Sequence, residues 1–491
     1  MSTRRTTAGK ERLEPAPWVN GRGATRPGSA PSRGGAAAKA GRATGGRTGA
    51  ARAGTARTGA AAGAATARRP ARERSSDAGR SPAARRPGAA RRAAPLGSGA
   101  PERRLLLLAT ALLLLYGLVM AYSASAAQAY FEHGTTFYFF RRQLVFAGLG
   151  VLALVVFSRI DYVVWRRFAV PFAIVAAGLL VTVFVPGFGV TARGARRWID
   201  LGFTQLQPSE IAKLAVVALL AALIVRDPGA LRTRQGFGRL VLVGLVPFGL
   251  LVGLLQKDLG TTLVLCVGAA AVLVAGGARW RHLLGLAALA PLLVGALILI
   301  EPYRMDRIAA FLDPQRFAQT SGFQATQSLV SIASGKIFGI GLGNSVQKFG
   351  YLPEQTTDMI TGIIGEELGL VGLLVLLGLY VLLAWAAFRI ALSCRELFGK
   401  LLAVGIAGLI IGQAFINIGA ALSVVPLTGV PLPLVSIGGT SLVVVLAGIG
   451  ILVNVSTNRR SYIVVSAPRS RRAPRRGGDG RPSDARSRRR R

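Results

Sequence analysis

Residues 105–123 read LLLLATALLLLYGLVMAYS and follow two arginines, Arg103 and Arg104. The stretch contains no charged side chain, and a helix needs about 20 apolar residues to cross the hydrocarbon layer of a bilayer. It therefore predicts a membrane-spanning helix. Because it begins only after residue 104 and is long enough to span, it does not fit a cleaved secretory signal.

Comparable apolar stretches recur through the middle of the chain. Their lengths, and the charged or Gly- and Pro-containing breaks between them, predict about ten spans and therefore an all-α polytopic membrane protein. The predicted spans are 105–123, 143–157, 168–186, 209–225, 239–255, 260–277, 283–300, 361–392, 401–424 and 437–455.

The two ends of the chain differ from this apolar middle. The 491 residues are 51% hydrophobic, yet the formal net charge is +39. Residues 1–104 account for +18 and residues 459–491 for +11, which leaves +10 for a membrane domain predicted over 105–458. Long apolar runs and only two cysteines exclude a soluble enzyme, a disulfide-stabilised scaffold and a DNA-binding domain as the main interpretation.

Both basic tails are predicted to be disordered. Residues 15–101 consist mainly of Ala, Gly, Arg, Ser, Thr and Pro, which bury too little apolar surface to offset the entropy of folding. Basic segments beside a membrane span are typical of a solvated cytoplasmic tail, or of a tail that binds anionic lipid headgroups. Nucleic-acid binding is not predicted, because no aromatic interleaving or folded module accompanies the charge.

The arginines between the spans predict their orientation. Basic loops follow every second span, which puts those loops and both termini in the cytoplasm. The fourth loop on the opposite, extracytoplasmic side has some 60 residues and is too long for a simple connection, so we expect the chemistry there. The predicted extracytoplasmic loops are about 124–141, 187–208, 256–259, 301–360 and 425–436.

Three pairs of charged residues lie within or at the ends of predicted spans, where an unpaired charge costs several kcal/mol. Each pair has a structural interpretation, as a neutralising pair or as a turn at the interface. Together, near the outer ends of spans, they predict a cavity open to the outside that could hold a charged headgroup. The pairs are Glu210 with Lys213, Lys257 with Asp258, and Glu366 with Glu367.

The most informative motif lies at the end of the long fourth loop. Residues 349–360 read FGYLPEQTTDMI, and residues 365–369 read GEELG. This pair of motifs resembles the signature of the SEDS family (shape, elongation, division and sporulation), the membrane peptidoglycan polymerases that include FtsW, RodA and SpoVE.

Further motifs agree with this family in order along the chain, most closely with its FtsW-like, division-type members. The resemblance departs from the family pattern at Thr357, Met359 and Ile437, and at Gly335-Lys336. It covers nearly all of residues 105–458. The agreeing motifs are 117–120 with 122–125, 194–199 with 207–210, 258–261, 322–324 with 327–328, 341–343, and 431–436 with 438–441.

The resemblance implies polymerisation of lipid II, an undecaprenyl-diphosphate-linked disaccharide peptide, at the outer face of the cytoplasmic membrane. The bond at the anomeric carbon of the donor sugar is α in lipid II and β in the glycan strand, so a single inverting displacement with one carboxylate as general base suffices. Two other functions stay open: a lipid II flippase, and a scaffold that recruits division proteins through the basic tails. An elongation-type, RodA-like role is the alternative to division.

The resemblance also assigns roles to residues. Asp358 is the expected general base, although a loop aspartate could merely cap the next helix. Arg196 and Arg197, with Arg193 a weaker candidate, are expected to bind phosphate, because guanidinium groups suit bidentate contact with phosphate oxygens. The other expected substrate-binding residues are Glu210, Lys213, Asp258, Glu354 and Glu367.

Expected ligands and partners follow from the same resemblance. No dedicated metal site is predicted, although Mg²⁺ or Mn²⁺ held by diphosphate and a carboxylate such as Asp358 or Glu354 would be ordinary chemistry. The expected partners are lipid II, a class B penicillin-binding protein and other division proteins. The expected location is the cytoplasmic membrane at the division septum.

Overall fold

The computed structural model describes residues 100–457, except 193–194, 203, 301–302 and 315. All of these belong to one compact unit, Ala89–Arg491. The disorder predicted for the two tails falls on residues outside the described ranges, apart from residues 100–104.

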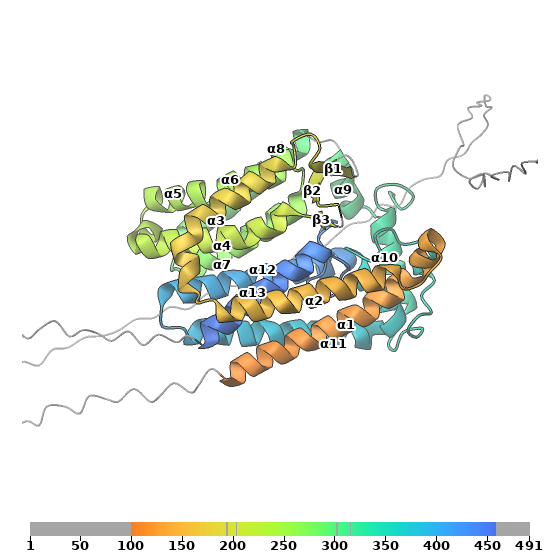
Figure 1. Ribbon diagram of the computed structural model, residues 1–491. Coiled ribbons are helices and arrows are strands. Elements are labelled where there is room, and N and C mark those ends of the chain that lie inside the picture. The colour runs from red at the N-terminus through yellow and green to blue at the C-terminus, as the bar shows by residue number, and fades with distance from the viewer. Residues whose placement is uncertain (1–99, 193–194, 203, 301–302, 315, 458–491) are drawn as a thin grey trace, which may run out of the picture. The chain divides into compact units, whose positions relative to one another are not determined.

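The described chain is mostly helical, with one small antiparallel sheet (Figure 1). The first half contains α1 (Ala100–His133), α2 (Tyr138–Arg159), α3 (Val163–Thr182), β1 (Gly189–Ala192), β2 (Ala195–Asp200), β3 (Gln205–Leu206), α4 (Pro208–Arg226), η1 (Pro228–Arg232), α5 (Arg234–Gly244), α6 (Val246–Leu250) and η2 (Leu251–Leu255). The second half contains α7 (Leu259–Ala275), α8 (Trp280–Ile300), α9 (Tyr303–Leu312), α10 (Phe323–Ser334), η3 (Gln347–Phe349), α11 (Ile360–Ser393), α12 (Leu397–Ala421) and α13 (Gly439–Thr457).

Every apolar stretch predicted to span a membrane lies largely within helical structure. Among the described residues, 7 helices are long and apolar enough to cross a membrane, or up to 8 if the bent pair formed by residues 234–244 and 246–255 counts as one span. The helix α7 is apolar but shorter, at 17 residues. A polytopic helical membrane protein is therefore confirmed, while the count of ten spans stays a prediction.

The first helix extends beyond its prediction at both ends. It begins at Ala100, so residues 100–104, which were assigned to the tail, form its first turn. Pro101 and Glu102 favour such a start, because proline fits the first turn and a carboxylate interacts well with the helix N-terminus. The helix continues to His133, so most of the loop predicted over 124–141 is helical. The prediction ended where strong hydropathy ends, although alanine-rich sequence propagates a helix well.

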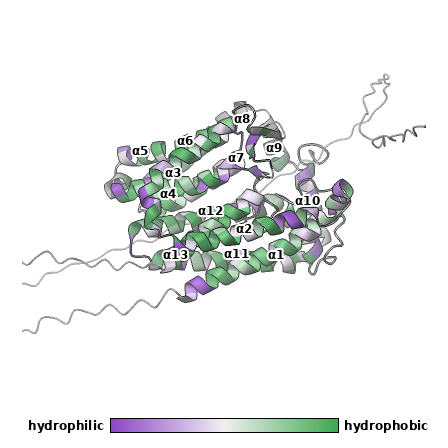
Figure 2. Ribbon diagram, in the orientation of Figure 1, coloured by the Kyte–Doolittle hydropathy of each residue, from purple (hydrophilic) through white to green (hydrophobic). Residues whose placement is uncertain are grey.

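Close helix packing depends on glycines at the crossings. The helix α13 packs along α2, and α1 packs along α11. A methyl group at Gly450 of α13 would lie 2.5 Å from the carbonyl oxygen of Leu154 in α2. Only glycine allows the two backbones to approach so closely. Apolar residues predominate along these helices (Figure 2).

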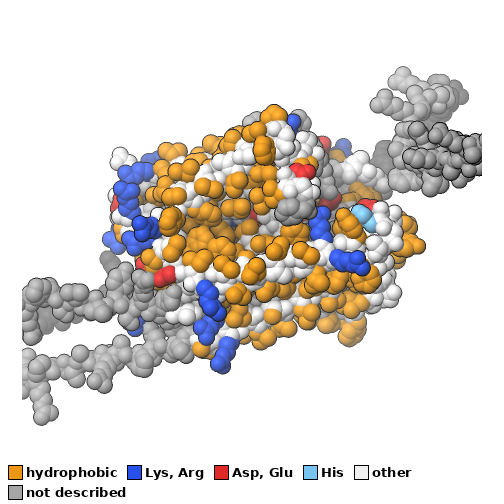
Figure 3. Space-filling model, viewed as in Figure 1, with side chains coloured by type: hydrophobic (Ala, Val, Ile, Leu, Met, Phe, Trp, Pro, Cys, Tyr) orange, Lys and Arg blue, Asp and Glu red, His pale blue; other side chains and the backbone are white. Residues whose placement is uncertain are grey.

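The helix bundle has two chemically different ends. At the end where α1 begins, Arg103 donates to Thr457, and the Tyr162 hydroxyl donates to Glu396 at 2.6 Å. Burial, with that hydrogen bond, raises the pKa of the Tyr162 phenol, which therefore stays protonated and keeps donating. Figure 3 shows hydrophobic side chains over the middle of the visible face and several Lys and Arg side chains toward this end.

At the opposite end lie the sheet, α9 and α10 (Figure 1). The strand β2 pairs with β1 and with β3, and Arg197 of β2 contacts the backbone of the α7 entrance. Thr440, near the start of α13, donates to the carbonyl oxygen of Gln205 in β3. The predicted extracytoplasmic loops therefore meet at one end of the bundle.

The helix α11 is broken at Gly369, whose φ of 66° is left-handed. A continuous helix would join the Glu366 and Glu367 carbonyls to the amides of Leu370 and Val371. Instead, these carbonyls accept from Ile340 and Gly341, both at 3.0 Å. The two freed amides donate to the carbonyl oxygens of Lys336 at 2.9 Å and Ile337 at 3.1 Å. Residues 336–341 thus replace the missing helical bonds.

Candidate active site

A cavity of about 630 Å³ lies at the end of the bundle that carries the sheet. We call it the main cavity. Its walls come from β2 and β3, the entrance of α7, α9, the end of the fourth loop, and residues 426–441. Four of the five predicted extracytoplasmic loops contribute residues, and Arg142 lies directly after the first. Such a convergence of loops at one concave site is typical of a ligand-binding or catalytic site.

Asp358 lines the main cavity from the last turn before α11. Its side chain is half-buried, and Oδ1 lies 3.1 Å from the Thr357 hydroxyl. The same hydroxyl lies 2.8 Å from Oε2 of Glu354, so the two carboxylates are neighbours. A hydroxyl has one proton to donate, so Thr357 can serve only one carboxylate at a time. Glu354 also lines the cavity and has a left-handed φ of 56°.

Asn417 of α12 fixes the backbone around Asp358. Its side-chain amide donates to the carbonyl oxygen of Asp358 at 2.8 Å and to that of Val430 at 2.7 Å. Its own oxygen accepts from the Thr361 hydroxyl at 2.9 Å. Asn417 is 1% exposed, and a buried amide whose bonds are satisfied in this way holds its partners rigidly. One buried side chain thus joins the loop aspartate to the wall formed by residues 426–431.

The structure separates the two neighbouring arginines of β2. Arg197 lines the main cavity and donates to the carbonyl oxygens of Gln256 at 3.0 Å and Lys257 at 2.7 Å. Arg196 is exposed, does not line the cavity, and donates to Thr191 at 3.2 Å. Successive side chains point to opposite faces of a regular strand, but the β1–β2 register shifts between Trp198 and Arg196, so that Arg197 and Trp198 both line the cavity and Arg196 does not. Arg193 lies outside the described residues.

Asp258 also lines the cavity but has a local structural role as well. It is the N-cap of α7, where it accepts from the Thr261 amide at 3.0 Å and from the Thr261 hydroxyl at 2.9 Å. Its Oδ2 lies 4.0 Å from a guanidinium nitrogen of Arg197. From the sequence, Lys257 and Asp258 could form either a turn at the interface or part of a substrate site. The N-cap explains why the chain breaks here between two spans.

Glu210 and Lys213 form a buried ion pair one turn apart on α4, with Oε2 and Nζ 2.7 Å apart. Neither residue lines the main cavity. Lys213 also donates to Gln413 of α12 at 2.7 Å, and Gln413 donates to the carbonyl oxygen of Pro431 at 2.8 Å. Gln413 thus connects the pair to the cavity wall, which agrees with the neutralising interpretation more than with direct substrate contact.

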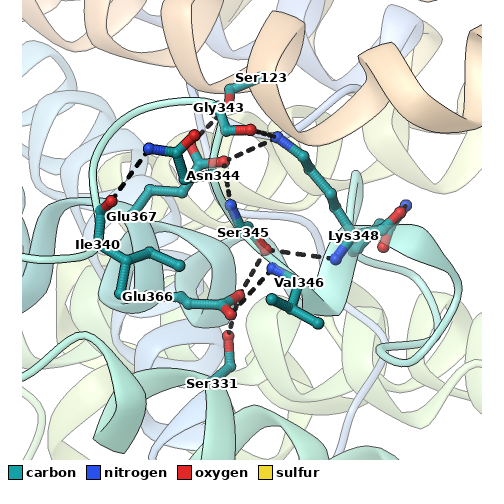
Figure 4. A network of polar contacts seen from close by, with 11 residues as sticks. Ser123, Ser331, Ile340, Gly343, Asn344, Ser345, Val346, Lys348, Glu366 and Glu367 are labelled. Carbon is teal, nitrogen blue, oxygen red and sulfur yellow. Dashed lines mark hydrogen bonds and ion pairs between the residues drawn. The ribbon is translucent and has the colours of Figure 1, made fainter.

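Glu366 and Glu367 are buried in a second polar network (Figure 4), and neither lines the main cavity. Glu367 accepts from the Ser123 hydroxyl of α1 at 2.5 Å and lies 3.3 Å from Nζ of Lys348. Glu366 accepts from the hydroxyl of Ser345 and from the Val346 amide at 3.1 Å. These carboxylates attach the fourth loop to α1 and α11, and Glu367 does not line the cavity where it was expected to contact substrate.

Cations line the main cavity beside its three carboxylates. Sequence reasoning did not select Arg142 or Arg307, because the first directly follows a predicted loop and the second lies in α9, within the long loop. Among the described residues, no three His, Cys, Asp or Glu side chains are grouped as a metal site. The lining cations are Arg142, Arg197, Lys257 and Arg307, and the lining carboxylates are Asp258, Glu354 and Asp358.

Comparison with known families identifies the architecture. Residues 103–461 match the model of the FtsW/RodA/SpoVE family, described as cell cycle protein. The chain belongs to this family. The resemblance inferred from the sequence motifs is therefore confirmed.

Relatives from several bacteria agree over the same region. Stage V sporulation protein E from Bacillus subtilis (strain 168) is 41% identical over 359 residues, which cover 72% of this chain and 97% of that protein. A probable peptidoglycan glycosyltransferase FtsW from Geobacter sp. (strain M18) is 38% identical over 362 residues, with coverage of 72% and 97%.

Solved structures of family members share the fold. A structure described as "Structural coordination of polymerization and crosslinking by a peptidoglycan synthase complex" matches with a TM-score of 0.60 at 34% identity, covering 72% of this chain and 97% of that one. The rod shape determining protein RodA from Thermus thermophilus matches with a TM-score of 0.54 at 32% identity and the same coverage.

Proposed function

We propose that this family member polymerises lipid II into glycan strands by inverting glycosyl transfer at the outer face of the cytoplasmic membrane, with Asp358 as general base. One observation supports this most directly: Asp358 lies in the same cavity as four cationic side chains. A base for a sugar hydroxyl and positive charge for a departing diphosphate are the two requirements of the reaction.

In the proposed reaction, Asp358 accepts the proton of the acceptor sugar hydroxyl as its oxygen bonds to the anomeric carbon of the donor. The bond from that carbon to the diphosphate oxygen breaks on the opposite face, which inverts the configuration. Undecaprenyl diphosphate leaves with the electron pair and its added negative charge. Arg197 is placed to stabilise that charge, since it lines the cavity while its backbone contacts hold it in position.

The test is polymerisation of purified lipid II by the full chain with its penicillin-binding partner. We expect Asp358→Asn to lower the rate by at least about 100-fold, the usual scale of general-base catalysis, at an unchanged unfolding temperature. The matched control is Asp306→Asn, an exposed carboxylate of α9 that does not line the cavity. Normal polymerisation by Asp358→Asn would contradict the base assignment.

A lipid II flippase is the alternative function. The lining carboxylates and cations lie at one end of the bundle, whereas transport requires a route between both ends. The buried charges of Glu210 and Lys213 are already bonded to each other and, through Lys213, to Gln413. These features favour polymerisation. Headgroup transport into vesicles without polymer formation would instead support the flippase.

Division is the proposed cellular role, supported by relatives that include proteins named FtsW as well as a sporulation protein. The proposed partners are a class B penicillin-binding protein and other division proteins, and the proposed location is the septum. A fluorescent fusion that follows the lateral wall during growth would favour elongation.

Mg²⁺ or Mn²⁺ held by the diphosphate with Glu354 and Asp358 is an auxiliary proposal, tested by chelation in the polymerisation assay.

A further inference from the structure

A second cavity, of about 400 Å³, lies between the end of α1 and residues 348–356. We call it the α1 cavity. It is separate from the main cavity, yet Glu354 lines both. Because the Thr357 hydroxyl contacts the carboxylates of both Glu354 and Asp358, a group bound in the α1 cavity would lie close to the proposed base.

Gln355, which lines the α1 cavity, carries one side-chain oxygen without a hydrogen-bond donor. Gln355 is 6% exposed, and its Nε2 donates to the Lys348 carbonyl oxygen at 2.8 Å. Its Oε1 is buried and has no hydrogen-bond partner among the described residues. A buried acceptor without a donor costs free energy, so this oxygen favours a ligand that brings an N–H or O–H group.

The charge of the α1 cavity favours a cation. Two carboxylates line it, those of Glu132 and Glu354. Lys348 also lines it, but its ammonium lies 3.3 Å from Glu367, bonds the Gly343 carbonyl oxygen and is directed into the buried network (Figure 4). Its charge is therefore already neutralised.

Aromatic rings complete the wall. Phe131 and Phe349 line the α1 cavity and are 74% and 57% exposed. The Lys348 ammonium lies 6.0 Å from the Phe349 ring centroid, so Phe131 offers the aromatic face for a ligand ammonium. An ammonium group gains from such a face as well as from carboxylates, whereas a neutral sugar gains only hydrogen bonds and stacking. Nδ1 of His133 lies 3.9 Å from Oε2 of Glu132, and this imidazole offsets the negative charge of Glu132 only when it is protonated.

We propose that the α1 cavity binds the free ammonium group of the peptide carried by the substrate, an inference that rests on the proposed function. Cross-linking of glycan strands joins an amine of one peptide to a carbonyl of another, so a cross-linkable substrate must carry such an amine. A peptide extended over about three residues reaches roughly 10 Å, which suits a cavity sharing a wall residue with the main one. Glu132, Glu354 and Gln355 then determine which peptides are accepted.

The test compares lipid II with a derivative acetylated on that amine, using the full chain with its partner. We expect acetylation to lower kcat/KM of the wild type about three- to tenfold through KM, the scale of a partly exposed ion pair. Glu132→Gln should lose the same factor on native lipid II and show no further loss on the acetylated substrate. Asp306→Asn, the matched charge control, should keep the wild-type preference.

Reversing the charge of both the substrate amine and residue 132 gives an independent test of the proposal. Succinylation turns the amine into a carboxylate, which Glu132 should repel and Glu132→Lys should accept, restoring part of the lost kcat/KM. Equal use of native and acetylated lipid II by the wild type would overturn the proposal while leaving polymerisation established. A Glu132→Gln variant that instead loses its penicillin-binding partner would also overturn it, in favour of a basic side chain of that partner. No polymer from native lipid II would refute the proposed function itself.

Discussion

Thr357 places one hydroxyl between two carboxylates, those of Glu354 and Asp358. We expect Thr357→Val, which keeps the shape and removes the hydroxyl, to lower kcat about tenfold with little change in KM, because Asp358 and Glu354 lose the hydroxyl that lies between them and fixes their carboxylates. Thr357→Ser should retain most of the rate. Steady-state polymerisation of lipid II measures both. Equal rates for the Val and Ser variants would show that the hydroxyl has no part in the reaction.

Arg196 and Arg197 form a natural matched pair of adjacent cations. Arg197 makes two charge-assisted bonds to backbone carbonyls and lines the main cavity, and removing such bonds costs about 1.5–3 kcal/mol. Because Arg197 is the cation proposed to stabilise the departing diphosphate, we expect Arg197→Gln to lower kcat/KM at least tenfold, whereas Arg196→Gln should stay within about twofold of wild type. The same polymerisation assay measures kcat/KM for both variants. Comparable losses in both variants would mean that charge on this strand acts at long range rather than by contact.

Only part of the site could be predicted from individual residues. Asp358 and Arg197 were expected at the site because their motifs resemble the family signature; both line one cavity, and their roles as base and phosphate ligand stay predictions. The sequence could not separate Arg196 from Arg197, because their facing depends on strand register. Asn417 was missed, although a buried amide in an apolar helix is itself a signal that polar partners lie nearby.

The break in α11 depends on one glycine. A methyl group at Gly369 would lie 2.4 Å from the Gly339 amide nitrogen, and the left-handed φ adds strain. We expect Gly369→Ala to destabilise the protein by about 3 kcal/mol or more, because both the clash and the backbone strain must be relieved. Thermal unfolding in detergent measures the effect.

The control for this substitution lies in the same helix. Gly378 has nothing within 4 Å of the site where a Cβ would stand, and its conformation is helical. Gly378→Ala should therefore leave stability unchanged or raise it by about 0.5–1 kcal/mol. If the two variants unfolded at the same temperature, the non-helical geometry at Gly369 would not be needed for folding.

The long apolar helices were easier to predict than the small sheet and the break within α11. Each of the ten predicted apolar stretches lies largely within helical structure, because burial in lipid or protein requires apolar length, whereas the short helices α9 and α10 of the fourth loop were not predicted. The sheet of β1 to β3 and the break at Gly369 were not predicted. Both depend on hydrogen bonds to distant segments, such as residues 336–341, and hydropathy along a chain contains no information about such partners.

At the scale of the whole molecule, orientation in the membrane is the main prediction still to be tested. Phe338 is 81% exposed and lies in the fourth loop, while Gln235 is exposed at the start of α5. In a background with Cys266 and Cys394 replaced by serine, we expect Phe338→Cys to react with an impermeant maleimide in intact spheroplasts. Gln235→Cys should react only after lysis, because its arginine-rich surroundings favour the cytoplasm. The reverse pattern would place the main cavity inside the cell.

The main cavity draws its walls from positions as far apart in the sequence as Arg142 and Ser441, and Ser441 belongs to α13, the last described helix. Since translation proceeds from the N-terminus, a nascent chain that lacks α13 has an incomplete wall. We therefore expect the main cavity to close, and catalysis there to become possible, only after α13 has been synthesised and packed.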